Sequence, residues 1–158
     1  MAQTKNLTLL PRGSHASPFV ELRQALSSRV ADISPFVDQL MRFVRLFIDK
    51  FRDVDGSEVI EIAVHEALGN AVIHGNHENP HKDVYVTCRC TMDGEVSITV
   101  RDEGEGFDSR ALPDPTDPDR RLLTHGRGIH LMRALMDEVC FEENGQVVRM
   151  RKRLRRPL

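Results

Sequence analysis

The chain has 158 residues and a mass of 18.0 kDa, which fits one domain and is too short for two independent catalytic domains. Hydrophobic residues make up 40% of the chain and charged residues 29%, so the composition excludes an intrinsically disordered protein. The net charge is −2 and aromatic residues are only 5%, without any Trp. The chain therefore offers no global attraction to nucleic acid and no stacking surface for single strands.

No apolar stretch approaches the roughly 18 residues that a membrane-spanning helix needs, and residues 1–10 lack the features of a secretory signal. Cys88, Cys90 and Cys140 cannot all pair, and their spacing does not match a zinc site. Free thiols are typical of a reducing compartment, so we expect a cytoplasmic protein without membrane association.

The first half of the chain predicts a short strand at residues 6–10, followed by two helices. The second helix is expected over residues 57–75, after a turn in which Asp55 and Glu58 have capping-box spacing. The first is expected over residues 34–52, with an apolar face made of Phe36, Val37, Leu40, Phe43, Val44, Phe47 and Ile48.

The second half predicts an antiparallel hairpin, because residues 83–91 and 95–102 alternate in polarity around Met92-Asp93-Gly94. Residues 102–119 then contain seven acids, one base and three prolines, which indicates a long loop. In a domain of this size such a loop is usually functional or disordered. After the loop we expect a helix at 129–136, a strand at 138–142, a turn at 144–145 and a last strand from 147.

This order of elements predicts an α+β sandwich. We divide the chain into an N-terminal arm or strand, residues 1–33, and one domain, residues 34–158. Residues 149–158 carry six basic side chains, which we interpret as a strand face with a tail; docking of an acidic partner is the alternative.

Two polar residues on the second helix, Glu66 and Asn70, lie one turn apart among the apolar residues Val59, Ile62 and Ile73. An isolated Glu and Asn at this spacing are usually solvated. Here the apolar neighbours indicate that the Glu66 carboxylate is half-buried and needs a partner. The core face of the same helix comprises Ile60, Ala63, Val64, Ala67, Leu68 and Ala71.

Alternation along residues 95–102 places Asp102 on the inward face at the end of the strand. A buried acid needs a donor, and a ligand with an amino group would supply one. Gly104 and Gly106 follow at once and would let a ligand approach the backbone closely, although a glycine turn after a strand is common.

Gly126-Arg127-Gly128 precedes the helix expected at 129–136, so its backbone N–H groups would form an anion site. The dinucleotide fingerprint and the P-loop motif are both absent. His74, His77 and His81 lie close together, but no completing ligand has a matching spacing, so we interpret them as a solvated loop.

Three segments in this order resemble the nucleotide-binding boxes of the GHKL, or histidine kinase-like, ATPase superfamily. They are Glu66-Ala-Leu-Gly-Asn-Ala-Val-Ile-His-Gly75, Asp102-Glu-Gly-Glu-Gly-Phe107 and Gly126-Arg-Gly-Ile-His-Leu-Met132. The chain is most similar to the bacterial anti-sigma factor serine/threonine-protein kinases, and the similarity covers about residues 34–153.

The resemblance implies a two-layer α/β sandwich of the Bergerat type, with a mixed, mainly antiparallel sheet and an ATP lid at residues 108–125. It implies ATP and Mg²⁺ as cofactors, Glu66 as the catalytic base, Asn70 as the metal ligand and Asp102 as the acceptor for the adenine amino group. Nucleotide contacts are implied for Asn70, His74, Asp102, Gly104, Gly106, Thr124, His125, Gly126, Arg127 and Gly128. Family members commonly carry Gly-Thr before the last strand, whereas this chain carries Gly145-Gln146.

The function implied is that of an ATP-dependent anti-sigma factor that binds a sigma factor and phosphorylates a serine of a STAS-type anti-anti-sigma protein. A homodimer is compatible with the resemblance, and no direct nucleic-acid partner is expected. Two alternatives remain at this stage. One is a nucleotide-gated binding module without phosphotransfer, and the other is a detached histidine-kinase catalytic domain.

Overall fold

Every second residue of the central strands is buried, which is the pattern of a sheet with one covered face. Strands β3 (Asp83–Thr91) and β4 (Glu95–Arg101) form an antiparallel hairpin, whose turn contains Gly94 with a φ of 96°. β6 (Val147–Arg153) pairs with β4, and β5 (Glu138–Glu142) pairs with β6. The hairpin and both C-terminal strands predicted from the sequence are thus confirmed.

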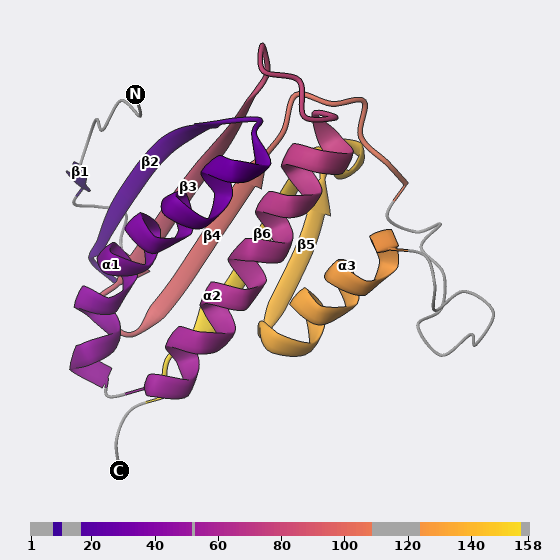
Figure 1. Cartoon of the computed structure of the whole chain (residues 1–158). Helices are drawn as coiled ribbons and strands as arrows, with labels where there is room; N and C mark the ends of the chain where they lie inside the picture. The colour runs from indigo at the N-terminus through magenta and orange to yellow at the C-terminus, as the bar shows by residue number, and fades with distance from the viewer. Residues whose placement is uncertain (1–7, 11–16, 52, 109–123, 156–158) are drawn as a thin grey trace.

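The computed structural model describes residues 8–10, 17–51, 53–108 and 124–155, with the backbone alone at 8–10, 54 and 124–125. The helices of this part lie together on one face of the sheet, which makes a two-layer α+β sandwich (Figure 1). The predicted fold class is therefore confirmed.

The sheet extends further toward the N-terminus than the sequence indicates. β2 (Phe19–Ser27) pairs with β3 over its full length, and β1 (Thr8–Leu10) pairs with β2. The strand order is β1-β2-β3-β4-β6-β5, and every pairing among the described strands is antiparallel. Sequence patterning does not reveal β2, because the polar residue Gln24 occupies a buried position where alternation calls for an apolar one.

Both helices predicted in the first half are present. α1 (Ile33–Phe51) buries the apolar stripe expected from its spacing, with Phe43 and Phe47 half-buried at its border. α2 (Val54–Gly69) continues into a π-helical turn, η2 (Asn70–Gly75), so the predicted second helix changes its winding at Asn70. Its predicted core face is fully buried at Ile60, Ala63, Val64, Ala67, Leu68 and Ala71.

The start of α2 differs from the expected capping box. Asp53 is the N-cap, and its Oδ1 accepts a hydrogen bond of 2.9 Å from the Gly56 backbone N–H. Asp55, the predicted cap, is an exposed residue of the first helical turn. The helix therefore begins at Val54, one residue before the predicted cap, because the side chain of Asp53 accepts a hydrogen bond from a backbone N–H of the first turn that has no partner within the helix.

The core lies between the helices and the sheet, and it is built from fully buried aliphatic and methionine side chains. Leu40, Ile60, Ile98, Met132 and Met150 are among the largest of these. Within the described ranges, none of the helices combines the length and apolar character needed to cross a membrane.

Candidate functional site

A cavity of about 410 Å³ opens between α2–η2, the C-terminal end of β4 and α3 (Thr124–Leu135). Its walls are mainly apolar, with a few polar groups, which is the usual character of a small-molecule site. The residues that line it are Ala67, Asn70, Ala71, His74, Gly75, Val100, Asp102, Gly106, Phe107, Asp108, Ile129, Met132, Phe141, Gly145, Gln146 and Val148.

The π-helical turn η2 supplies the polar side of this cavity. It carries Asn70 and His74, both predicted site residues, and both line the cavity. A π-helical turn is rare and occurs frequently at functional sites. The change of winding thus coincides with the residues for which the sequence implies nucleotide contacts.

The amide of Asn70 has an unused hydrogen-bonding group. Its Nδ2 is buried and has no partner among the described residues. A buried polar atom without a partner is costly, so its presence at the wall of a cavity indicates a ligand-binding role. Because the amide O and N are interchangeable by a flip, the same side chain can present its oxygen to a metal ion.

Glu66 lies one turn before Asn70 and is half-buried, but it does not line the cavity. Its Oε2 lies 2.5 Å from the position that a Cβ on Gly128 would take, so its carboxylate faces α3. Ile62 and Ile73, expected to shield it, are 44% and 38% exposed. The half-buried face of α2 is therefore narrower than the sequence indicates, and Glu66 is open to solvent on one side.

Asp102 also lines the cavity, next to Gly75 at the end of η2, and it is half-buried as alternation along β4 predicts. Burial raises the pKa of its carboxyl group, while the Gly104 N–H and the charges of Lys82 and His77 lower it in part. Its Oδ1 accepts a hydrogen bond of 2.8 Å from Gly104 N, which leaves the rest of the carboxylate for a donor from a ligand.

Gly104 and Gly106 occupy positions where a side chain would clash or strain the backbone. A Cβ on Gly104 would overlap the carbonyl oxygen of Gly75, so the loop after β4 packs directly on the end of η2. Gly106 has a φ of 79°, in the left-handed region that glycine adopts without strain. Of the two, Gly106 lines the cavity and Gly104 lies behind it.

The third predicted segment differs most from expectation. Gly126, Arg127 and Gly128 lie inside α3, which starts at Thr124, so they do not form a loop before a helix. Arg127 is exposed, and none of the three lines the cavity; Gly128 faces Glu66 and Asn70 from the side. The helix begins early because α3 packs along α2, which outweighs the low helix propensity of glycine.

Parts of the predicted site cannot be placed. The backbone of Thr124 and His125 opens α3, but their side chains lie outside the described residues. Of the predicted lid at residues 108–125, residues 109–123 also lie outside them. Among the described residues, no three His, Cys, Asp or Glu side chains gather in a group that could hold a metal ion.

Sequence reasoning missed several residues around the cavity. Phe107 and Phe141 pack edge to face at 5.4 Å between ring centroids, and both line the cavity. Asn76 and Gln146 hydrogen-bond to the loop that carries Asp102. The sequence pointed only to Phe107, as the end of the second box, and to Gln146, as a departure from the family pattern, because the other contacts join distant segments.

The cavity fits a nucleotide. Its apolar walls and the Asp102 carboxylate suit a purine base with an amino group, and the unpaired amide of Asn70 suits the polar phosphate end. The amide oxygen of Asn70 is a hard ligand, which suits Mg²⁺ better than a softer metal.

Comparison with known proteins gives the same assignment. Residues 26–152 match the histidine kinase-like ATPase domain. The chain is 34% identical to the anti-sigma F factor of Heyndrickxia coagulans over 139 residues, which cover 84% of this chain and 82% of that protein. It is 31% identical to the anti-sigma F factor of Oceanobacillus iheyensis over 137 residues, with the same coverage. It is 33% identical to the serine-protein kinase RsbW of Staphylococcus epidermidis over 109 residues, which cover 65% of this chain and 69% of the kinase. The matched segments also form a cavity that suits a nucleotide. The chain therefore belongs to the histidine kinase-like ATPase family, whose members share the use of a nucleotide.

Proposed function

We propose that this protein is an ATP-dependent anti-sigma factor that phosphorylates a serine on an anti-anti-sigma protein. The observation that carries the proposal is the position of Glu66. Its carboxylate lies beside the cavity and not in it, next to Asn70 and open to solvent. A base in that position is accessible to a hydroxyl group that a second protein brings to the edge of the site.

At the base end of the cavity, Asp102 accepts a hydrogen bond from the adenine amino group, and the apolar walls enclose the ring. At the other end, the Asn70 oxygen would hold Mg²⁺, which would supply positive charge to neutralise the phosphates. The backbone at the start of α3 would contact the phosphates where they leave the cavity. Asn70 and Asp102 thereby hold opposite ends of one nucleotide.

Glu66 takes the proton from the serine hydroxyl as its oxygen attacks the terminal phosphorus, and ADP leaves. Phosphoryl transfer depends mostly on positioning and electrostatic stabilisation, so little further chemistry is required of the protein. The phosphorylated antagonist can no longer displace the bound sigma factor.

The partners follow from the relatives. Anti-sigma F factors are named for their sigma-factor target and the RsbW kinases for serine phosphorylation. We extend both properties to this chain and place it in the cytoplasm, where its free cysteines Cys88, Cys90 and Cys140 stay reduced.

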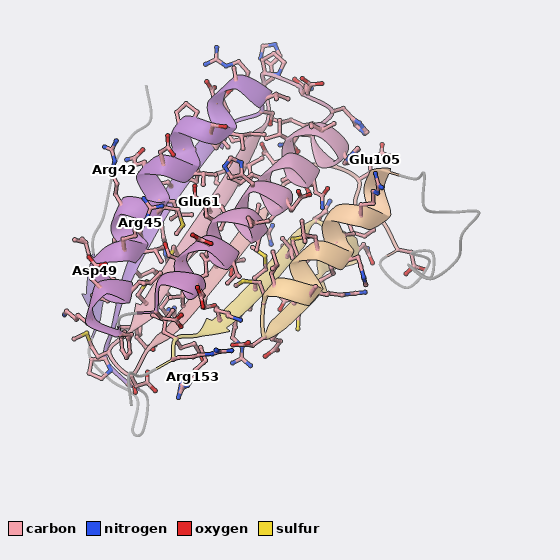
Figure 2. All side chains as sticks on the ribbon, turned by 60° about the horizontal axis from the view of Figure 1, so that its bottom comes forward. Arg42, Arg45, Asp49, Glu61, Glu105 and Arg153 are labelled. Carbon is pink, nitrogen blue, oxygen red and sulfur yellow. The ribbon has the colours of Figure 1, made fainter. Side chains whose placement is uncertain are left out.

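The decisive experiment is phosphotransfer from radiolabelled ATP to the candidate antagonist. Glu66→Gln should reduce the labelling rate by about 100-fold or more, while ATP affinity changes less than about threefold, because the residue lies outside the cavity. Glu61→Gln is the matched control, since Glu61 lies on the same helix and pairs with Arg45 of α1 at 2.8 Å (Figure 2). That control should retain full activity.

Full labelling by Glu66→Gln would show that Glu66 is not the base. Binding of the antagonist without any label from the wild-type protein would identify a nucleotide-gated binding module. Acid-labile phosphate on a partner would identify a histidine-kinase domain.

A further inference from the structure

Two amide side chains hold the loop that carries Asp102. The Oδ1 of Asn76 accepts a hydrogen bond of 2.7 Å from the Glu103 N–H, and the Nε2 of Gln146 donates to the Gly104 carbonyl. The backbone carbonyl of Gln146 also accepts a hydrogen bond of 3.0 Å from the Asp102 N–H. Glu103 and Gly104 are therefore fixed by the two side-chain amides, and Asp102 by the backbone of Gln146.

Asn76 is anchored on its other side to the far half of the sheet. Its Nδ2 donates to Ser28 Oγ at 2.8 Å and to the Asp83 carbonyl at 2.9 Å. Ser28 is fully buried and donates in turn to the Lys82 carbonyl at 2.6 Å. Asn76 is only 1% exposed, so this network has no water to replace a lost bond.

The Asp102 carboxylate itself has little direct support. Within the described ranges its only hydrogen bond comes from Gly104 N, which belongs to the same loop. A bond inside the loop moves with the loop and cannot fix its position. The place of the carboxylate in the cavity thus depends on the backbone bonds that Asn76 and Gln146 make.

Gln146 also reaches the cavity directly. It lines the cavity beside Asp102, and its Nε2 is committed to Gly104. The side-chain donor of Gln146 therefore supports the loop that carries Asp102 and is not available to a ligand.

We propose that Asn76 and Gln146 are positioning residues for purine selectivity, because they hold Asp102 where it meets the exocyclic amino group of adenine. The inference rests on the proposed function to the extent that the cavity binds ATP. It predicts that loss of either amide weakens recognition of the amino group specifically and leaves the rest of the nucleotide contacts in place.

The test compares two nucleotides by calorimetry, ATP and purine riboside 5′-triphosphate, which lacks the 6-amino group. The wild-type protein should bind ATP about tenfold or more tightly, as expected for a hydrogen bond to a charged acceptor. Gln146→Met keeps the length of the side chain but removes the donor to Gly104. It should weaken ATP about tenfold, change the analogue less than about twofold and so remove the preference.

Asn76→Ala should also remove the preference, but it leaves the Glu103 N–H and the Asp83 carbonyl without partners and lowers stability. Gln146 is half-exposed, so Gln146→Met should not lower stability in this way, and the test does not depend on whether Asn76→Ala folds. Gln24→Met is the matched control, because Gln24 is a buried glutamine on β2 that does not line the cavity, and its amide has no partner among the described residues. It should leave both affinities unchanged.

A preference that stays at its wild-type value in Gln146→Met and in folded Asn76→Ala would overturn this inference and leave ATP binding intact. A proportional loss of both affinities would show a purely structural role and would also overturn it. Wild-type protein that binds neither nucleotide would overturn the proposed function and this inference together.

Discussion

Asp102 is a residue whose burial opposes stability. Burial raises the pKa of its carboxyl group, so the folded state holds the proton more tightly than the unfolded state does. The ionised form present at neutral pH therefore lowers the free energy of unfolding, and this cost is relieved as the pH falls through the raised pKa. A residue that costs stability at the wall of a cavity is one that a ligand is expected to compensate.

Asp102→Asn should leave the unfolding temperature unchanged or slightly higher, because it removes the buried charge and keeps an oxygen for the Gly104 N–H. ATP affinity should fall about tenfold to 100-fold, since a charged acceptor is lost. In the wild-type protein, ATP affinity should also fall as the pH drops through the raised pKa. Calorimetry and thermal melts measure these effects, with exposed Glu105→Gln as the charge control (Figure 2). Wild-type affinity in Asp102→Asn would show that the carboxylate does not contact the base.

Gly128 is a second residue with a specific steric requirement. An alanine Cβ there would lie 2.5 Å from Glu66 Oε2, which is the end of a flexible side chain. The side chain can move away at little cost to folding, so Gly128→Ala should remain stable while phosphotransfer falls about tenfold or more from a displaced base. A rate measurement on the antagonist tests this. Gly69→Ala, where a Cβ meets nothing within 4 Å, should keep its activity. Equal rates in both variants would contradict the assigned position of Glu66.

At the scale of elements, the start of α2 depends on one side chain. Asp53 accepts hydrogen bonds from Gly56 N at 2.9 Å and from Arg155 N at 2.7 Å. It thus caps the helix that carries Glu66 and also attaches to that helix the segment that follows β6. The exposed Asp55, which the sequence favours as the cap, is the natural comparison.

Asp53→Ala should lower the free energy of unfolding by about 1 kcal/mol, because the cap bond is lost. For a protein of this size that corresponds to about 2–4 °C in the melting temperature. Asp55→Ala should change the free energy by a few tenths of a kcal/mol, since it makes only a favourable charge interaction with the helix start. Denaturant melts of both variants measure these losses in the free energy of unfolding. A larger loss from Asp55→Ala than from Asp53→Ala would support the capping box predicted from the sequence.

At the scale of the whole molecule, the small net charge is a sum of many opposite charges, and those near the last strand lie in pairs. The arginines of the last strand, β6, are exposed and pair with nearby acids. Arg149 pairs with Glu142 and Arg151 with Glu138, both on β5, and Arg153 pairs with Asp93 in the turn between β3 and β4. Exposed pairs of this kind contribute little stability, but they leave few free charges on that face. The interpretation of residues 149–158 as a strand face is borne out for the part that lies in β6, residues 149–153.

Nucleotide binding should stabilise the whole domain, because the cavity is formed by α2, η2, α3 and three strands that come together only in the folded state. With Mg²⁺ and ATP at 100 times its Kd, the free energy of unfolding should rise by about 2.7 kcal/mol. The melting temperature should then rise by about 5–10 °C. Scanning fluorimetry with and without a chelator measures the increase and the metal's share of it. Absence of any shift at saturating ATP would contradict nucleotide binding at this cavity.

Local patterns in the sequence were sufficient for the faces of α1 and α2, the β3–β4 hairpin and the inward position of Asp102. These features depend on helical periodicity, alternation and turn residues, which act over a few positions. Only the tertiary structure revealed β2, because Gln24 interrupts its alternation, and the early start of α3, because packing on α2 outweighs two glycines. The amide contacts of Asn76 and Gln146 join residues 27 and 42 positions apart, and such bonds exist only once the chain has folded. The sequence by itself thus determined which side chains are available for the chemistry, and the fold decided how they are held in place.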